Sequence, residues 1–250
     1  MKLTTSFIIA FFLYSAGVVF AQDNAFYEDD TPLLYRQESS LGINLHTSGM
    51  GVSFRRGTQL TVARKRMIEV DLVGMKHPKE YKTHITKDSP SFVYGKLNYV
   101  SLLRTGLGFQ HVLFAKGDRS GVEIRFNYSA GLSLAILKPV YLDIIKRSGQ
   151  YPFEKTRHEP QRYDPNLHQL SDIYGRSSFG YGSNELSFHP GGYAKSGFSF
   201  EYGKNDKSIR ALEAGAVLDL FPKAIPIMAY VNNNNYYFSL YLAMYFGGKW

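Results

Sequence analysis

The sequence predicts an all-β protein, an antiparallel transmembrane β-barrel of about eight strands. Three observations lead to this fold class. Segments in which apolar and polar residues alternate recur along the chain and are long enough to cross a bilayer as strands. The number of such segments is even. The connections between them alternate between short and long, as hairpins at the two ends of a barrel do.

The clearest alternation lies at the C-terminus, between Tyr236 and Trp250. Side chains alternate between the two faces of a strand, so every second residue shares a face. One face is apolar and the other is small, polar or hydroxylated; the apolar face comprises Tyr236, Phe238, Leu240, Leu242, Met244 and Phe246. The segment exceeds the roughly 9–11 residues that a tilted strand needs to cross a bilayer. It is therefore predicted to be a membrane-crossing strand.

The same period of two recurs upstream. In the segment 122–136, for example, Ile124 and Phe126 alternate with Arg125 and Asn127. The remaining predicted strands are Leu41–Thr47, Met50–Arg55, Ile68–Gly74, Arg104–Phe114, Tyr193–Tyr202 and Leu212–Phe221.

The connections fit a barrel with both ends of the chain on the periplasmic side. Short polar periplasmic turns are expected at 56–64, 116–120 and 204–208. The external connections should be longer. Two of them are, at 76–103 and 146–187, whereas the one at Ser48 and Gly49 is tight. The stretch 146–187 has no strong period, which leaves an ordered loop and a partly disordered one both open.

Residues 1–21 are interpreted as a signal peptide cleaved after Ala21, with Lys2 as the positive region and 7–20 as the apolar run. The alternative, a membrane anchor, is disfavoured because the run is shorter than the roughly 20 residues of a spanning helix. Residues 22–37 would form a periplasmic arm and 38–250 the barrel domain. The absence of cysteine excludes lipid attachment at the mature N-terminus, disulfides and thiolate metal sites.

The composition is unusually aromatic without being strongly apolar. The chain has 19 Tyr and 18 Phe, while the hydrophobic fraction is 44%. Such a balance fits a barrel with an apolar outside, aromatic girdles and a polar interior. It also fits an aromatic-rich soluble β-sandwich, so composition alone leaves both open.

The last predicted strand carries a resemblance to a known family. It ends in alternating apolar residues closed by an aromatic residue, with Phe246 and Trp250 in these places. In this it resembles the outer-membrane β-barrel superfamily, over 41–250, although Phe is the commoner final residue there. The resemblance implies an outer-membrane location, a monomer, and recognition of Phe246 and Trp250 by the barrel-assembly machinery. The net charge of +8 then points to outer-membrane lipid and lipopolysaccharide as partners rather than to nucleic acid.

The polar faces of the predicted strands carry charges of both signs, with His46 near one end. The expected interior ion network comprises Arg55, Glu69, Asp71, Glu123, Arg125, Lys195, Glu201, Glu213 and Asp219. In a barrel of about eight strands the interior is only wide enough for side chains. A plug of paired charges is therefore favoured over a narrow polar conduit.

The predicted external strand ends combine proline with lysine or histidine. Residues expected to surround this rim and to contact an anionic group are Lys76, His77, Lys79, Lys138, His189 and Lys223. Proline lacks a backbone donor and so ends strands in any case. Strand termination with contacts to lipid phosphates is the simpler interpretation, and a dedicated anion site is the sharper one.

The predicted function is a structural or surface-binding barrel with a plugged interior and no large pore. The alternative is a barrel enzyme, a hydrolase or acyltransferase that modifies lipid A or phospholipid at the external rim. Its candidate residues would be His77, His189, Ser187 and Glu80, but no motif fixes their spacing. The sequence predicts no cofactor and no metal site.

Overall fold

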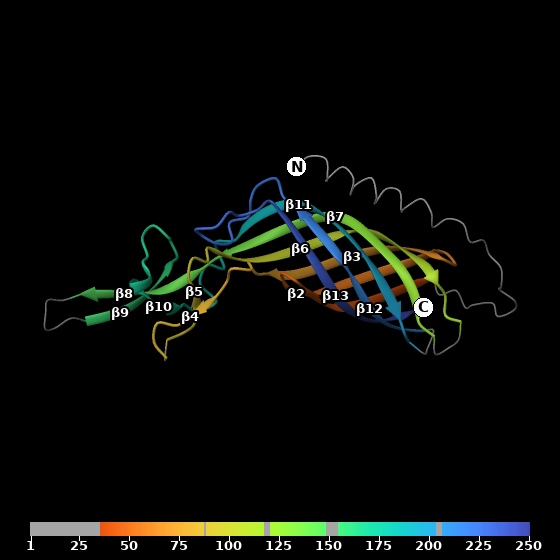
Figure 1. Cartoon of the computed structure of the whole chain (residues 1–250), viewed down its shortest axis with the longest axis horizontal. Coiled ribbons are helices and arrows are strands. Elements are labelled where there is room, and N and C mark those ends of the chain that lie inside the picture. Colours follow the sequence, from red (N-terminus) through yellow and green to blue (C-terminus); the bar gives the residue numbers. More distant parts are fainter. Residues whose placement is uncertain (1–35, 88, 118–120, 149–154, 204–206) are drawn as a thin grey trace, which may run out of the picture. The chain divides into compact units, whose positions relative to one another are not determined.

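The main sheet of the protein closes on itself. In the computed structural model, which describes residues 36–250 except 88, 118–120, 149–154 and 204–206, eight antiparallel strands form a closed barrel (Figure 1). This confirms the predicted closed eight-stranded fold. The barrel strands are β1 (Gln37–His46), β2 (Gly49–Thr61), β3 (Arg64–Met75), β6 (Asn98–Phe114), β7 (Glu123–Pro139), β11 (Ser187–Glu201), β12 (Ser208–Leu220) and β13 (Tyr236–Lys249). No helix among the described residues is long and apolar enough to cross a membrane.

Closure joins the first strand to the last. β1 pairs with β13 from Glu38–Lys249 to His46–Tyr241. Beyond that ladder, Gln37 and Trp250 exchange two backbone hydrogen bonds of 2.9 Å each. The final residue of the chain therefore completes the hydrogen-bonded ring, which leaves no open sheet edge in the barrel.

The two ends of the barrel differ. At the end where β2 meets β3, β6 meets β7 and β11 meets β12, the connections are short; we call it the turn end. At the opposite, loop end, β1 turns into β2 through Thr47 and Ser48. Gly49 is required there, because a Cβ atom at this position would lie 1.9 Å from the carbonyl oxygen of Gly74.

Several strands extend further than the alternation predicted. β2 reaches Thr61 and β3 starts at Arg64, so most of the turn expected at 56–64 is strand. β6 starts at Asn98 and β11 at Ser187, well before the predicted starts. At the start of β6 the inward Val100 and Leu102 are apolar, so the polar inward face that marks other strands is missing. At the start of β11 Pro190, Gly191 and Gly192 interrupt the pattern, because proline and glycine are uncommon inside strands.

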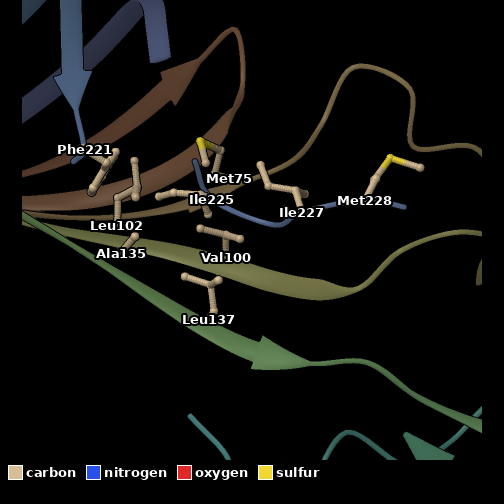
Figure 2. Packing of buried hydrophobic residues seen from close by; sticks show 9 residues of the cluster. All are labelled: Met75, Val100, Leu102, Ala135, Leu137, Phe221, Ile225, Ile227 and Met228. Atoms are coloured by element: carbon tan, nitrogen blue, oxygen red, sulfur yellow. The ribbon is translucent and has the colours of Figure 1, made fainter. Parts of the chain in front are cut away.

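The segment between β12 and β13 closes the loop end from inside (Figure 2). Its Ile225 and Ile227 are 0% and 1% exposed and belong to one buried cluster with inward residues of the neighbouring strands. The cluster, which we call the apolar cap, consists of Met75, Val100, Leu102, Ala135, Leu137, Phe221, Ile225, Ile227 and Met228. No pattern in the sequence predicted this cap.

Beyond the loop end the chain builds two small sheets. β8 (Tyr141–Ser148), β9 (Lys155–Arg162) and β10 (Ile173–Arg176) form one, and β4 (Lys82–Thr83) and β5 (Phe92–Val93) form the other. A short 3-10 helix spans Leu170–Asp172. A second buried cluster supports this extension: Phe92, Val140, Leu142, Ile144, Tyr163 and Ile173. The stretch 146–187, which had no predicted strand, thus contains strands of the extension.

The outward face of the barrel strands is apolar and exposed. Leu41 is 65% exposed, Leu132 72% and Phe238 62%. Towards the turn end this band is bounded by outward arginines: Arg56, Arg66 and Arg210. On β13 the outward residues from Phe238 to Phe246 carry no charge. They form a continuous apolar strip on the surface of the barrel.

We expect the apolar cap to contribute to stability. Replacing Ile225 with alanine should reduce the free energy of unfolding by about 2–5 kcal/mol, because it leaves a cavity in a closely packed cluster. Urea unfolding of the folded protein in detergent, followed by the fluorescence of the single tryptophan, measures this loss. Ile85→Ala is the control, since Ile85 is 44% exposed. Equal effects of the two substitutions would contradict the proposed role of the cap.

Candidate functional site

The centre of the barrel interior holds a buried Arg–Glu pair from facing strands. Arg55 of β2 binds Glu213 of β12 in a bidentate manner, with Nη1–Oε2 at 2.6 Å and Nη2–Oε1 at 2.7 Å. Asn127 and Tyr241 donate further hydrogen bonds to the same carboxylate, at 2.6 and 2.7 Å. Glu213 is 0% exposed, and bidentate charge-assisted hydrogen bonds of this kind are among the strongest in proteins.

A second cation extends this network across the interior. The Lys195 ammonium contacts the carboxylate of Glu69 and lies 2.9 Å from Oδ2 of Asp71. Glu69 also accepts from Arg55 at 3.3 Å, so it links the two cations. Ser129 donates to the other oxygen of Glu69 at 3.4 Å. These residues come from strands on different sides of the ring, and together they fill its middle.

A further pair lies nearer the loop end and joins the predicted Asp219 to Arg104, which the sequence did not single out. Arg104 of β6 binds Asp219 of β12, with Nε–Oδ1 at 2.9 Å and Nη2–Oδ2 at 2.7 Å, and Ser133 donates to Asp219. Arg104 is 1% exposed. The sequence signal was weak, because the inward neighbours Val100 and Leu102 are apolar and hide the alternation that would have marked Arg104 as an inward residue.

The turn end holds a third group of charges. Arg125 contacts Glu123 and lies 2.8 Å from Glu201, which also binds Lys249 at 2.5 Å. Lys65 binds Glu38 at 2.5 Å. Glu123, Arg125 and Glu201 belong to the predicted network, whereas Glu38 and Lys65 lie outside the predicted strand segments, where no alternation marked their inward direction. Lys249 lies on the polar face of the predicted strand 236–250 but was not assigned to the network.

The interior of the barrel is filled by these side chains. Between Arg55, Gln110 and Arg125 lies a cavity of about 20 Å³, roughly the space of one water molecule. His46 lies inside against the ring of Tyr241, with 5.6 Å between centroids, and neither of its ring nitrogens has a hydrogen-bond partner in the described part of the chain. The arrangement leaves little room for a conduit through the described interior.

The protein is similar to known proteins in structure rather than in sequence. No protein-family model and no curated protein matches the sequence. Two of the solved structures that are similar to it illustrate the match. One is the Neisserial surface protein A, with 11% identity, 86% of this chain and 96% of that chain covered, and a TM-score of 0.40. The other is Ail, the attachment invasion locus protein of Yersinia pestis, in complex with the heparin analogue sucrose octasulfate, with 6% identity, the same coverages and a TM-score of 0.36.

The residues predicted to form a basic rim lie at the loop end but at separate points. Lys76, Lys79 and Lys223 are exposed, while His77 is half-buried. Lys138 and His189 lie near the loop-end termini of β7 and β11. Lys138 already covers the ring of Phe179, 3.3 Å from its centroid. No contact among the described residues gathers these six side chains into one pocket.

Lys96, which the sequence did not single out, forms an ion pair at the same end of the barrel. Lys96 binds Glu80 at 2.5 Å, in the connection between β3 and β6. Burial lowers the pKa of Lys96, and the positive charge of Lys76 lowers it further, whereas Glu80 opposes the shift. Glu80 is thereby engaged in a structural ion pair.

The residues of the enzyme alternative do not assemble. Glu80 is held by Lys96, and Nδ1 of His77 accepts the backbone N–H of Lys79 at 3.1 Å. Ser187 and His189 lie on β11, opposite Leu137 and Ala135. Within the described residues, no hydrogen bond joins a histidine ring to Ser187. No group of three or more His, Asp or Glu side chains in that part of the chain is arranged to hold a metal ion.

We expect Arg104 and Asp219 to stabilise the fold only when both are present. Arg104→Leu should reduce the free energy of unfolding by about 3–5 kcal/mol, because it leaves the buried Asp219 carboxylate without its cation. The double variant Arg104→Leu/Asp219→Leu should recover most of this loss, since it removes both charges.

Urea unfolding in detergent measures both variants against Arg157→Leu, which changes an exposed arginine of β9. The same small effect for Arg104→Leu and Arg157→Leu would show that Arg104 is solvated. A double variant no more stable than Arg104→Leu alone would show that the cost does not come from an unpaired charge.

Proposed function

We propose that the protein is an integral outer-membrane barrel, closed to solutes, that presents its extension at the cell surface in a structural or binding role. The observation that carries this proposal is the inversion of polarity across the sheet. Charges are paired inside the barrel, and the outside is apolar and exposed. Only a nonpolar solvent around the barrel makes that arrangement favourable.

The outward band supports a membrane environment. Soluble monomers rarely expose an apolar patch of more than a few hundred Å². Here large exposed apolar side chains lie on every barrel strand, from Leu41 on β1 to Phe246 on β13. The arginines Arg56, Arg66 and Arg210 border the band on one side, where they would meet lipid headgroups.

The filled interior argues for a role other than transport. An eight-stranded barrel encloses only enough space for side chains, and here these side chains are hydrogen-bonded charges under an apolar cap. A solute would have to displace both the ion network and the cap. We therefore assign the function to the outside and to the loop end, where lysines such as Lys76, Lys79 and Lys223 would contact phosphates of the outer leaflet.

Membrane fractionation tests the proposed location. The protein, processed to begin at Gln22, should sediment with outer membranes and run with heat-modifiable mobility on gels. Deleting Trp250 should lower the amount of folded protein, because Trp250 pairs with Gln37 at barrel closure and Phe246 and Trp250 would form the assembly signal. A wild-type protein found in the soluble periplasm would refute the proposal. Unchanged folded levels after the deletion would refute the role of the last residue.

Conductance measurements test the closed interior. We expect planar bilayers with the purified protein to show no large, stable conductance, because the ion network and the cap block the path. A porin reconstituted by the same procedure is the positive control. Stable, large conductance steps from the wild-type chain would contradict the plugged barrel and restore the conduit as an explanation of its polar interior.

A further inference from the structure

A tyrosine at the loop end is held in an unusual backbone conformation. Tyr230 has φ of 60°, in the left-handed region, and among the described residues the other positive φ values belong to glycines. Its side chain is 71% exposed. A non-glycine residue in this region is strained, and such strain concentrates at functional sites. Stability alone would favour glycine at this position.

The turn that carries Tyr230 is fixed from several sides. The backbone N–H of Ala229 donates to the carbonyl of Gly95 at 2.7 Å. The Asn233 side chain accepts from the N–H groups of Ile227 and Met228, at 3.0 and 3.3 Å, and donates to the carbonyl of Met228 at 3.0 Å. Ile227 and Met228 belong to the apolar cap. The strained turn is thus anchored in the barrel, so Tyr230 is presented in a defined position.

The ring of Tyr230 extends a small aromatic cluster. It stacks on Tyr94, with 6.4 Å between centroids and 17° between planes, and Tyr94 meets the buried Tyr163 edge-on at 6.2 Å. The Tyr230 hydroxyl donates to the carbonyl of Pro165 at 2.8 Å, which fixes the direction of the ring. Since Tyr94 covers one face and the side chain is largely exposed, the other face is open to solvent.

The loop that accepts the Tyr230 hydroxyl carries amides and one acid. Asn166 is next to Pro165, and Asn232 lies two residues after Tyr230; both are exposed amides that can donate and accept hydrogen bonds. Asp164, on the other side of Pro165, accepts the backbone N–H of Asn166 at 2.9 Å. Lys96, the cation of the neighbouring segment, is paired with Glu80. The exposed Leu167 extends the apolar surface beside Asn166.

We propose that Tyr230 is the platform of a binding site for an uncharged sugar ring of a glycan. The apolar face of a pyranose presents C–H groups that fit the negative face of an aromatic ring. Its hydroxyls need groups that both donate and accept, as Asn166 and Asn232 do. A sulfated or phosphorylated sugar would meet the Asp164 carboxylate, while Lys96 is already paired with Glu80. This inference goes beyond the proposed function, and its test does not depend on the membrane location.

The test uses the full chain, folded in a zwitterionic detergent so that no sugar headgroup competes, on an array of neutral and sulfated oligosaccharides. We expect binding to a neutral glycan that persists at about 0.5 M salt, where charge interactions are screened. Tyr230→Gly should weaken this binding by about tenfold or more. Tyr230→Phe, which keeps the ring, should retain most of it.

Thermal unfolding separates a binding role from a structural one. Tyr230→Gly should leave the midpoint unchanged or raise it, because glycine relieves the strain at φ of 60°. Tyr81→Gly is the matched control, since Tyr81 is 75% exposed and lies outside the cluster; it should leave glycan binding unchanged.

Three results would overturn the proposal. They are equal glycan binding by Tyr230→Gly and the wild type, binding only to sulfated glycans that salt abolishes, and no binding to any neutral glycan on the array. A lowered midpoint with unaltered glycan binding would identify Tyr230 as a structural residue. Fractionation and conductance of the same variants do not depend on glycan binding. A failure of this site is therefore distinguishable from a failure of the membrane proposal.

Discussion

The structure depends on the pairing of opposite charges inside a ring of strands too narrow to hold water in quantity. Arg55, Glu213, Glu69 and Lys195 come from four strands and meet near the barrel axis, with bidentate contacts as short as 2.6 Å. Burial of a charge away from water is tolerated only when the charge contacts an opposite charge with good geometry. The register of the whole sheet is therefore constrained, because a shift by one residue would turn these side chains outward.

The segment between β12 and β13 connects the interior to the surface. Its Ile225 and Ile227 complete the apolar cap over the ion network, while the turn directly after them carries Tyr230. The rigid cap thus supplies the anchoring that a strained, exposed residue requires. Stability of the barrel and presentation of the loop-end surface therefore rest on the same residues.

Much of the barrel was predictable because alternation is a local property. The strand at 236–250 and the polar face with Arg125 and Glu213 followed from side-chain period alone. The prediction weakened where the inward face of a strand is apolar, as at Val100 and Leu102, and the start of β6 and Arg104 were missed for that reason. The extension around β8 was also missed. Its strands are short and form a small sheet of their own, so they lack the long alternation of strands with one face towards lipid.

The sequence by itself determined the fold class, the number of barrel strands and the direction of most charged side chains, because these depend on spacing within one strand. Only the tertiary structure decided which charges pair, that Ile225 and Ile227 turn back into the barrel, and that Tyr94, Tyr163 and Tyr230 meet. The physical reason is common to all three. Partners such as Arg55 and Glu213 are separated by most of the chain, and no local pattern encodes a contact that closure and register of the ring create.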